Sequence, residues 1–155
     1  MFFLIATLWA SGSDQTPMNY EKYSGHDNYW KMVPKIIICK NKVNFTKKQI
    51  EAAVKIWKKP YSTIEEKNNC NYELERGKIK IVDGKYLKER QWGYTSYLYS
   101  NREENGKNVK AFSSALVQLD KSIDNENILI HEIGHAFGIN HYDHSYDIMN
   151  SYASY

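Results

Sequence analysis

The residues with the clearest capacity for chemistry are histidines. The chain contains five histidines, and four of them lie in its last quarter. His131 and His135 are four positions apart, which places both imidazoles on one face of a helix, about one turn apart. Glu132 stands beside them, Gly138 lets the chain turn back, and His141 then supplies a third imidazole. Three imidazoles with an open fourth position are typical of a catalytic zinc site.

This spacing is far more specific than a pair of histidines. With the chain's own residue frequencies, the five specified residues coincide by chance in roughly two of 100,000 shuffled sequences. Glu132 lies one position beyond a ligand, so its carboxylate can act on water at the metal without binding the metal itself. We predict that His131, His135 and His141 bind one Zn²⁺ and that Glu132 is the general base.

The segment HEIGHAFGINH and the methionine that follows it carry a family resemblance. Residues 131–149 resemble the metzincin zinc peptidases, and Met149, eight residues after His141, is most similar in spacing to the matrixin branch. The resemblance implies that the three histidines bind zinc, that Glu132 is the general base, and that Met149 lies in a tight turn beneath the metal. It also implies a twisted, mostly parallel sheet with an antiparallel edge strand, two main helices and a small C-terminal subdomain.

Several alternatives remain open around the third histidine. Tyr142 stands where branches of this family carry Ser, Glu or Asp, so the branch is undecided. Asp143 or Asp147 would be the oxygen ligand in a site with two histidines and an aspartate. Tyr152 could reach the metal, although packing is the better explanation for it, and Met149 could be an ordinary core residue. His26 and His144 are isolated, and we predict no second zinc site.

The expected activity is that of a zinc-dependent metalloendopeptidase. Zinc would activate a water molecule, and Glu132 would take its proton and later protonate the leaving amine. The polypeptide substrate would bind extended along an edge strand, which we expect at 109–119, near Ser113 to Leu119. The alternative is a non-catalytic, zinc-binding, proteinase-like module that binds a partner. A non-peptide amide or ester substrate would use the same metal chemistry.

Hydrophobic periodicity and capping residues predict the elements that must position this site. Strands are expected at Val33 to Lys40, Lys78 to Val82, within Tyr86 to Ser100, and at Val109 to Leu119; helices are expected from the Thr46–Gln49 capping box to Pro60 and from Asp124 or Asn125 to Gly138; loops are expected at 61–77 and 101–108. The order of strand, helix, strands and helix indicates a mixed α/β domain of the α+β class, with the histidines on the last helix.

Composition indicates one ordinary globular domain. The chain has 155 residues, 42% hydrophobic and 25% charged, and its net charge is +3, so neither a second core nor a nucleic-acid-binding surface is expected. We assign 33–155 to the metzincin-like catalytic domain and 1–32 to a possible signal peptide and lead-in segment. We expect a monomer.

The N-terminus and the two cysteines bear on location. Residues 1–10 form an uncharged apolar run followed by small residues, as in a secretory signal, but the run is too short to span a bilayer. An apolar N-terminal strand or a start codon placed too late would also explain it. Cys39 and Cys70 are the two cysteines, and either a disulfide or two buried thiols fits them. We expect a secreted or extracellular protein.

Overall fold

The computed structural model describes residues 28–40, 42–142 and 147–150, which form one sheet covered by two helices. The mixed α/β class predicted from the sequence is confirmed. The elements are, in chain order, β1 (Tyr29–Trp30), β2 (Lys35–Cys39), α1 (Lys47–Ile56), β3 (Ile64–Lys67), β4 (Lys78–Asp83), β5 (Gly93–Glu104), β6 (Lys107–Leu119) and α2 (Glu126–Ala136).

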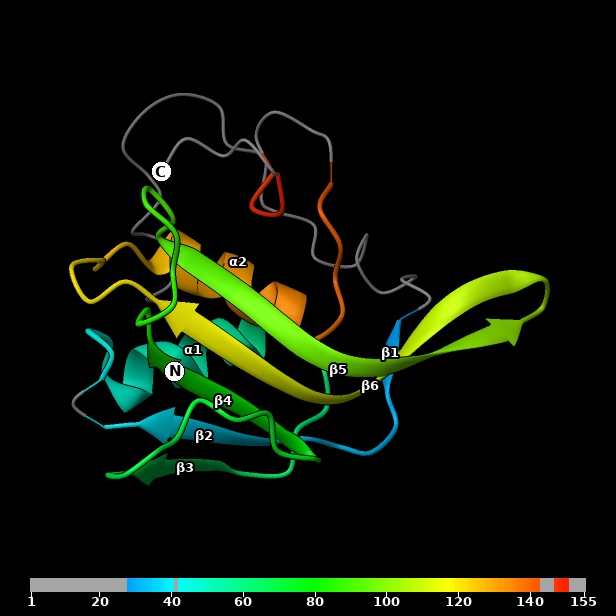
Figure 1. Cartoon of the computed structure of the whole chain (residues 1–155), viewed down its shortest axis with the longest axis horizontal. Coiled ribbons are helices and arrows are strands. Elements are labelled where there is room, and N and C mark those ends of the chain that lie inside the picture. The colour runs from blue at the N-terminus through cyan, green and yellow to red at the C-terminus, as the bar shows by residue number, and fades with distance from the viewer. Residues whose placement is uncertain (1–27, 41, 143–146, 151–155) are drawn as a thin grey trace, which may run out of the picture.

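The sheet is mostly parallel, with one antiparallel strand (Figure 1). Strands β3, β2, β4 and β6 lie side by side and are parallel, and β5 pairs antiparallel with β6 along nearly its whole length. The short β1 pairs with β6 at Ala111 and Phe112, beyond the part of β6 that β4 covers. A mostly parallel sheet with an antiparallel edge strand, as predicted, is therefore present.

The position of the edge strand was predicted wrongly. The expected edge strand, 109–119, is β6, which pairs with β4 on one side and with β5 on the other. The edge is β5 instead. From Ala111 to Leu119 the side chains of β6 are almost all buried, as in a strand inside a parallel sheet, where both faces are covered.

Three further boundaries differ from the prediction. The 61–77 segment, expected to be a loop, contains β3, whose polar sequence IEEK lacks the usual apolar pattern of a strand. The 101–108 segment, also expected to be a loop, is mostly strand, because Asn105 and Gly106 both adopt positive φ and close a two-residue hairpin turn. Residues 29–30, placed in the lead-in segment, form β1.

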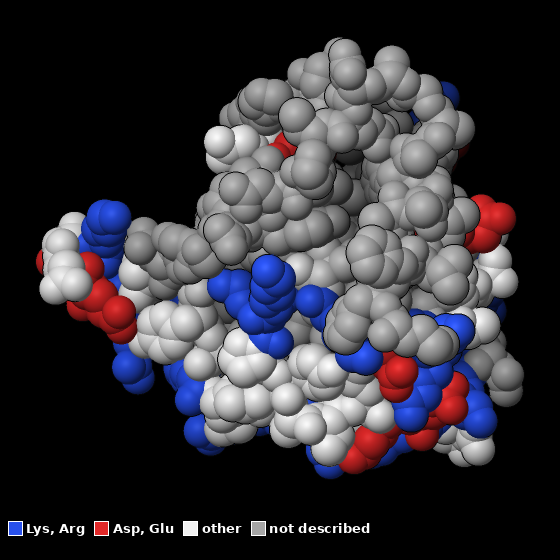
Figure 2. Space-filling view, turned by 180° about the vertical axis from the view of Figure 1, so that it is seen from behind, with Lys and Arg blue, Asp and Glu red and all other residues white. Residues whose placement is uncertain are grey.

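The β5–β6 hairpin projects well beyond the rest of the sheet (Figure 1). Its tip, seen at the left of Figure 2, carries both positive and negative side chains, and Arg102, Glu103, Glu104 and Lys107 are exposed there. Tyr29 of β1 donates a hydrogen bond to Glu104 at 2.9 Å and so ties the hairpin to the body. On the described part of the face in Figure 2, the two signs of charge are interspersed.

Both helices pack on one face of the sheet. Alternation within each strand sends one set of side chains to this face, including Ile79 and Ile81 of β4, while Lys80 and Val82 point to the other. The predicted capping box of α1 is confirmed, since Thr46 accepts a hydrogen bond from the Gln49 main chain at its N-terminus. The helix-facing core is formed by apolar residues of β2, β4, β6, α1 and α2.

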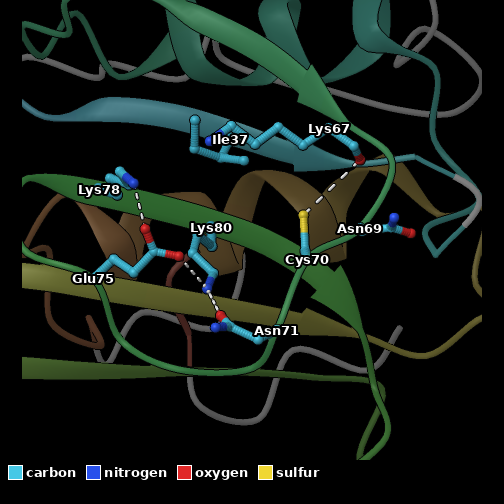
Figure 3. A pocket seen from close by; sticks show the side chains of 8 residues that line it. All are labelled: Ile37, Lys67, Asn69, Cys70, Asn71, Glu75, Lys78 and Lys80. Atoms are coloured by element: carbon cyan, nitrogen blue, oxygen red, sulfur yellow. Dashed lines mark hydrogen bonds and ion pairs between the residues drawn. The ribbon is translucent and has the colours of Figure 1, made fainter.

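The opposite face of the sheet is covered by the 68–77 loop. A disulfide joins Cys70 of this loop to Cys39 of β2, so the cysteines are paired. Lys80 points from β4 into the loop with 2% of its surface exposed, and its ammonium donates to Asn71, to the Glu73 carbonyl and to the Glu75 carboxylate. Figure 3 shows Lys80, Asn71 and Glu75 among the residues that line a small pocket. Three acceptors satisfy the three protons of a buried ammonium.

The structure bears on two expectations, the lack of a membrane span and the small C-terminal subdomain. Among the residues that the structure describes, no helix is long and apolar enough to cross a membrane. Of the predicted C-terminal subdomain, the structure describes 137–142 and 147–150, and residues 143–146 and 151–155 lie outside the described part of the chain, as do residues 1–27.

Because of the ion pairs beneath the 68–77 loop, we expect the stability of the fold to decrease at acid pH. Hydrogen bonds from Lys78 and Lys80 lower the pKa of Glu75 from 4.5 to about 2. Because the folded pKa is the lower one, this carboxylate stabilises the fold above pH 4.5, and the stabilisation disappears as the pH falls toward 2. We expect Glu75→Gln to lower the free energy of unfolding at pH 7 and to flatten its dependence on pH between 4.5 and 2. Urea unfolding at pH 7 and at several pH values between 4.5 and 2 measures both effects.

The matched control is Glu103→Gln, a carboxylate exposed at the hairpin tip. It should leave the pH dependence as in the wild type. An unchanged slope in Glu75→Gln would contradict the interpretation of the loop.

Candidate metal centre

Helix α2 carries the histidines and is fixed at both ends. Asn125 begins it by accepting a hydrogen bond from the Asn127 main chain at 3.0 Å, as an N-cap residue does. The chain turns directly after it at Gly138, where φ is +91°. A Cβ at this position would lie 2.7 Å from Phe112 Cε2, so both the backbone angle and the space require glycine. The turn brings His141 back toward the helix.

The three predicted ligands lie together. His135 Nε2 is 3.0 Å from His131 Nε2 and 3.0 Å from His141 Nε2. One nitrogen from each ring lies within 4.8 Å of the other two, close enough to bind a single metal ion. His131 and His141 come from different segments, so the cluster exists only because the chain reverses after α2. The three predicted ligands are therefore close enough to bind one metal ion, and its identity as zinc stays a prediction.

Hydrogen bonds at the far side of two rings fix how they present their nitrogens. His131 Nδ1 lies 2.6 Å from the Ile148 carbonyl and His135 Nδ1 lies 2.8 Å from the Ile139 carbonyl. A carbonyl can only accept, so each Nδ1 carries the proton and each neutral ring turns the Nε2 lone pair inward. Two such lone pairs 3.0 Å apart repel each other, and a cation between them removes the repulsion. The donor set therefore fits a metal ion, and imidazole nitrogens suit zinc among others.

Burial favours the neutral form that binds metals. Desolvation, followed by the neighbouring His131, lowers the pKa of His135 to about 3. Desolvation also lowers the pKa of His131, against the effect of its hydrogen bond to Ile148. Burial of His131 and partial burial of His135 thus favour the unprotonated imidazole, which is the state a metal ligand requires.

Glu132 lies next to the cluster but outside it. Its side chain is 7% exposed, and desolvation raises its pKa to about 7, while a hydrogen bond from Thr95 acts in the opposite direction. Thr95 Oγ1 lies 2.7 Å from Glu132 Oε2 and 3.0 Å from the Glu132 carbonyl. Thr95 was not predicted as a site residue, because alternation along a strand shows which face a side chain occupies and not which helix residue that side chain contacts.

Gly93 makes room for the same carboxylate. A Cβ at this position would lie 2.7 Å from Glu132 Cγ and 2.8 Å from Glu132 Oε1. Real Cβ contacts essentially never come this close, so any other residue would displace the Glu132 side chain or the start of β5. No sequence motif pointed to Gly93.

The methionine turn lies directly behind the first histidine. Asp147 accepts a hydrogen bond from the Met149 main chain at 2.9 Å, and the Asn150 main chain donates to the Asp147 carbonyl at 3.0 Å. Ile148, between them, supplies the carbonyl that binds His131. Met149 is fully buried. Within the described residues the metal-ligand cluster contains no carboxylate, and Asp147 holds the turn.

A contact below the histidines explains the glycine in the middle of α2. A Cβ on Gly134 would lie 2.7 Å from Trp57 Cζ2 and 2.8 Å from Met149 Sδ. Trp57 also donates from Nε1 to the Ile130 carbonyl at 2.9 Å. An indole and a thioether thus pack directly on the backbone of the histidine-bearing helix. Trp57 is the residue that caps the C-terminus of α1, and helical periodicity does not indicate this contact.

An open cleft of about 760 Å³ lies above the histidines. One wall is the beginning of β5 with the residues before it, and the other is α2 with the segment that follows it. Trp92, Tyr94 and Tyr97 give the β5 wall an aromatic character. Desolvation and nearby Glu132 raise the pKa of Tyr97 to about 12, so its hydroxyl stays protonated in the cleft. The remaining candidates His26, Asp143, His144 and Tyr152 lie outside the described residues.

Comparison with known proteins identifies no family for this chain. No protein-family model matches the chain, and a search of curated proteins finds no significant match. The interpretation of the site therefore depends on its own residues.

The cluster predicts stoichiometric metal binding. We expect the metal-free protein to bind one Zn²⁺ per chain and to melt at a higher temperature when loaded, since the ion binds the folded state. His141→Ala should weaken binding by at least about 100-fold, the upper range for loss of a ligand's supporting contact. His141 is the exposed member, so its removal leaves the core intact. Competition with a chelator of known affinity gives the constants.

His26→Ala is the matched control, because it removes a histidine that we do not assign to the cluster. Wild-type affinity in His141→Ala would show that the three rings do not share an ion.

Proposed function

We propose that this protein is a zinc-dependent endopeptidase of the metzincin type. One observation carries the proposal: three imidazole nitrogens converge on one point at the floor of an open cleft, and the Glu132 carboxylate lies beside that point without joining the cluster. A site that binds metal for structure alone has four protein ligands and no open position. Here the described residues offer three ligands, a neighbouring carboxylate and space for a substrate.

Each residue then has one task. His131, His135 and His141 would hold the ion, which when bound supplies a Lewis acid that polarises the scissile carbonyl and makes water more acidic. Glu132 accepts a proton from the attacking water and donates it to the amine as the peptide bond breaks. Its burial beside Thr95 keeps the carboxylate at the floor of the cleft.

The edge strand β5 offers a place for an extended peptide. The Asp120 main chain donates to the Trp92 carbonyl at 2.9 Å, and such pairs alternate along an antiparallel ladder. Main-chain groups of Gly93, Thr95 and Tyr97 therefore point away from β6, toward the open edge. Among the described strands, β5 pairs with β6 alone. We propose that a substrate adds to this edge, in place of the 113–119 segment expected earlier.

The disulfide supports a proposal for location. Cys39 and Cys70 are paired, and disulfides persist in oxidising compartments and are rare in the cytosol of most cells. We therefore propose a secreted or extracellular protein, where a peptidase meets unfolded or exposed polypeptides.

A cleavage assay tests the activity. We expect the zinc-loaded wild type to cleave members of a mixed peptide library, with the products identified by mass spectrometry. Glu132→Gln should retain one zinc and lose at least about 100-fold in kcat, because general acid–base catalysis contributes about 10²–10⁴-fold. Removing zinc with a chelator should abolish cleavage, and restoring zinc should recover it.

Glu126→Gln is the matched control, since it makes the same change in the first turn of the same helix. It should cleave like the wild type. If both glutamate variants and the wild type bind zinc equally and none cleaves any peptide, the protein is a non-catalytic zinc module.

A further inference from the structure

A hydrogen bond joins Thr95 of strand β5 to Glu132, the proposed general base. Glutamate has three rotatable bonds, so a Glu132 side chain at the floor of a cleft has several positions to choose from. Thr95 Oγ1 contacts it at two points, 2.7 Å from Oε2 and 3.0 Å from the main-chain oxygen. Both groups are buried, and the threonine side chain itself has a stiff χ1 angle. The acceptor is a carboxylate, which makes this one of the stronger kinds of hydrogen bond.

The two carboxylate oxygens have different surroundings. Oε2 is held by Thr95, while Oε1 lies against Gly93, where no side chain is present. Gly93, Thr95 and Glu132 all line the cleft. One oxygen is thus held by a threonine hydroxyl, and the other lies beside the main chain of Gly93.

We propose that Thr95 is a positioning residue for Glu132: its hydroxyl holds Oε2 so that Oε1 is presented to the reacting water, in a slot that Gly93 keeps open. This inference rests on the proposed peptidase function. It adds a residue of strand β5 that positions the general base. Thr95 and Gly93 belong to the same strand edge that is offered to the substrate. A peptide that shifts β5 therefore also shifts the general base.

Kinetics of two threonine variants test the inference. Thr95→Val keeps the shape and removes the hydroxyl, and we expect kcat to fall about 10- to 100-fold with KM nearly unchanged, since small misplacements of a catalytic group have costs of this size. Thr95→Ser keeps the hydroxyl and should recover most of the lost kcat. Zinc content should stay at one per chain in both variants, because Thr95 is not among the clustered ligands.

The matched control is Thr63→Val. Thr63 also donates to a glutamate carboxylate, Glu65 Oε1 at 3.2 Å, but on β3 at the opposite edge of the sheet. Its removal should leave kcat and KM as in the wild type. Gly93→Ala provides a second variant of the slot and should also lower kcat, because its Cβ would displace Oε1.

A second measurement is independent of activity. Urea unfolding of the metal-free wild type, Thr95→Val, Glu132→Ala and the double variant forms a cycle, and we expect the loss of stability from Thr95→Val to be clearly smaller when Glu132 is already absent. Additive losses, or a wild-type kcat in Thr95→Val while Glu132→Gln is inactive, would overturn the inference and leave the peptidase proposal standing. If the wild type cleaves nothing, the peptidase proposal fails, and the cycle still decides whether Thr95 holds Glu132.

Discussion

The structure depends on one constraint, the convergence of three imidazole Nε2 atoms on a single point. Rings that turn lone pairs toward one another repel, so the protein must hold such rings from behind. Main-chain carbonyls do this for His131 and His135, one from the methionine turn and one from the turn after α2. The site is therefore built as much from the backbone that follows the helix as from the helix itself, and a change in either turn would move a ligand.

The sheet forms the second wall of the cleft, opposite helix α2. Helix α2 presents its ligands on one side, and the beginning of β5 lies across from it, so the cleft has one helical wall and one strand wall. Trp57 and Met149 fill the space beneath, where Gly134 lets them reach the helix backbone. On the other face of the sheet, the disulfide and buried Lys80 fasten the 68–77 loop. The face that carries the histidine cluster and the face covered by the loop share the same central strands.

Much of this was predictable because the signals are local. Histidine spacing, the Thr46–Gln49 capping box and the glycine stop each act within a few residues, and each was found in the structure. The order of strands in the sheet is not local, and here two predictions were wrong: β6 was expected at an edge but pairs with β4 and β5, and β3 was expected to be a loop because its side chains are polar. Contacts between distant segments, such as Thr95 with Glu132, leave no periodic trace. Those contacts set the geometry of the carboxylate, so the cluster of three histidines was foreseeable and the position of the Glu132 side chain was not.

The same arrangement ties folding to metal binding. Without an ion, the protein keeps mutually repelling nitrogens 3.0 Å apart and a buried carboxylate beside them, and each of these lowers the stability of the metal-free fold. An ion that occupies the centre removes the first cost and stabilises the native state in proportion to its affinity. The remaining scaffold must then be stable enough to hold the turns in place before the ion arrives. The disulfide, the satisfied lysine and the indole beneath α2 all lie where they serve that purpose, away from the open position of the site.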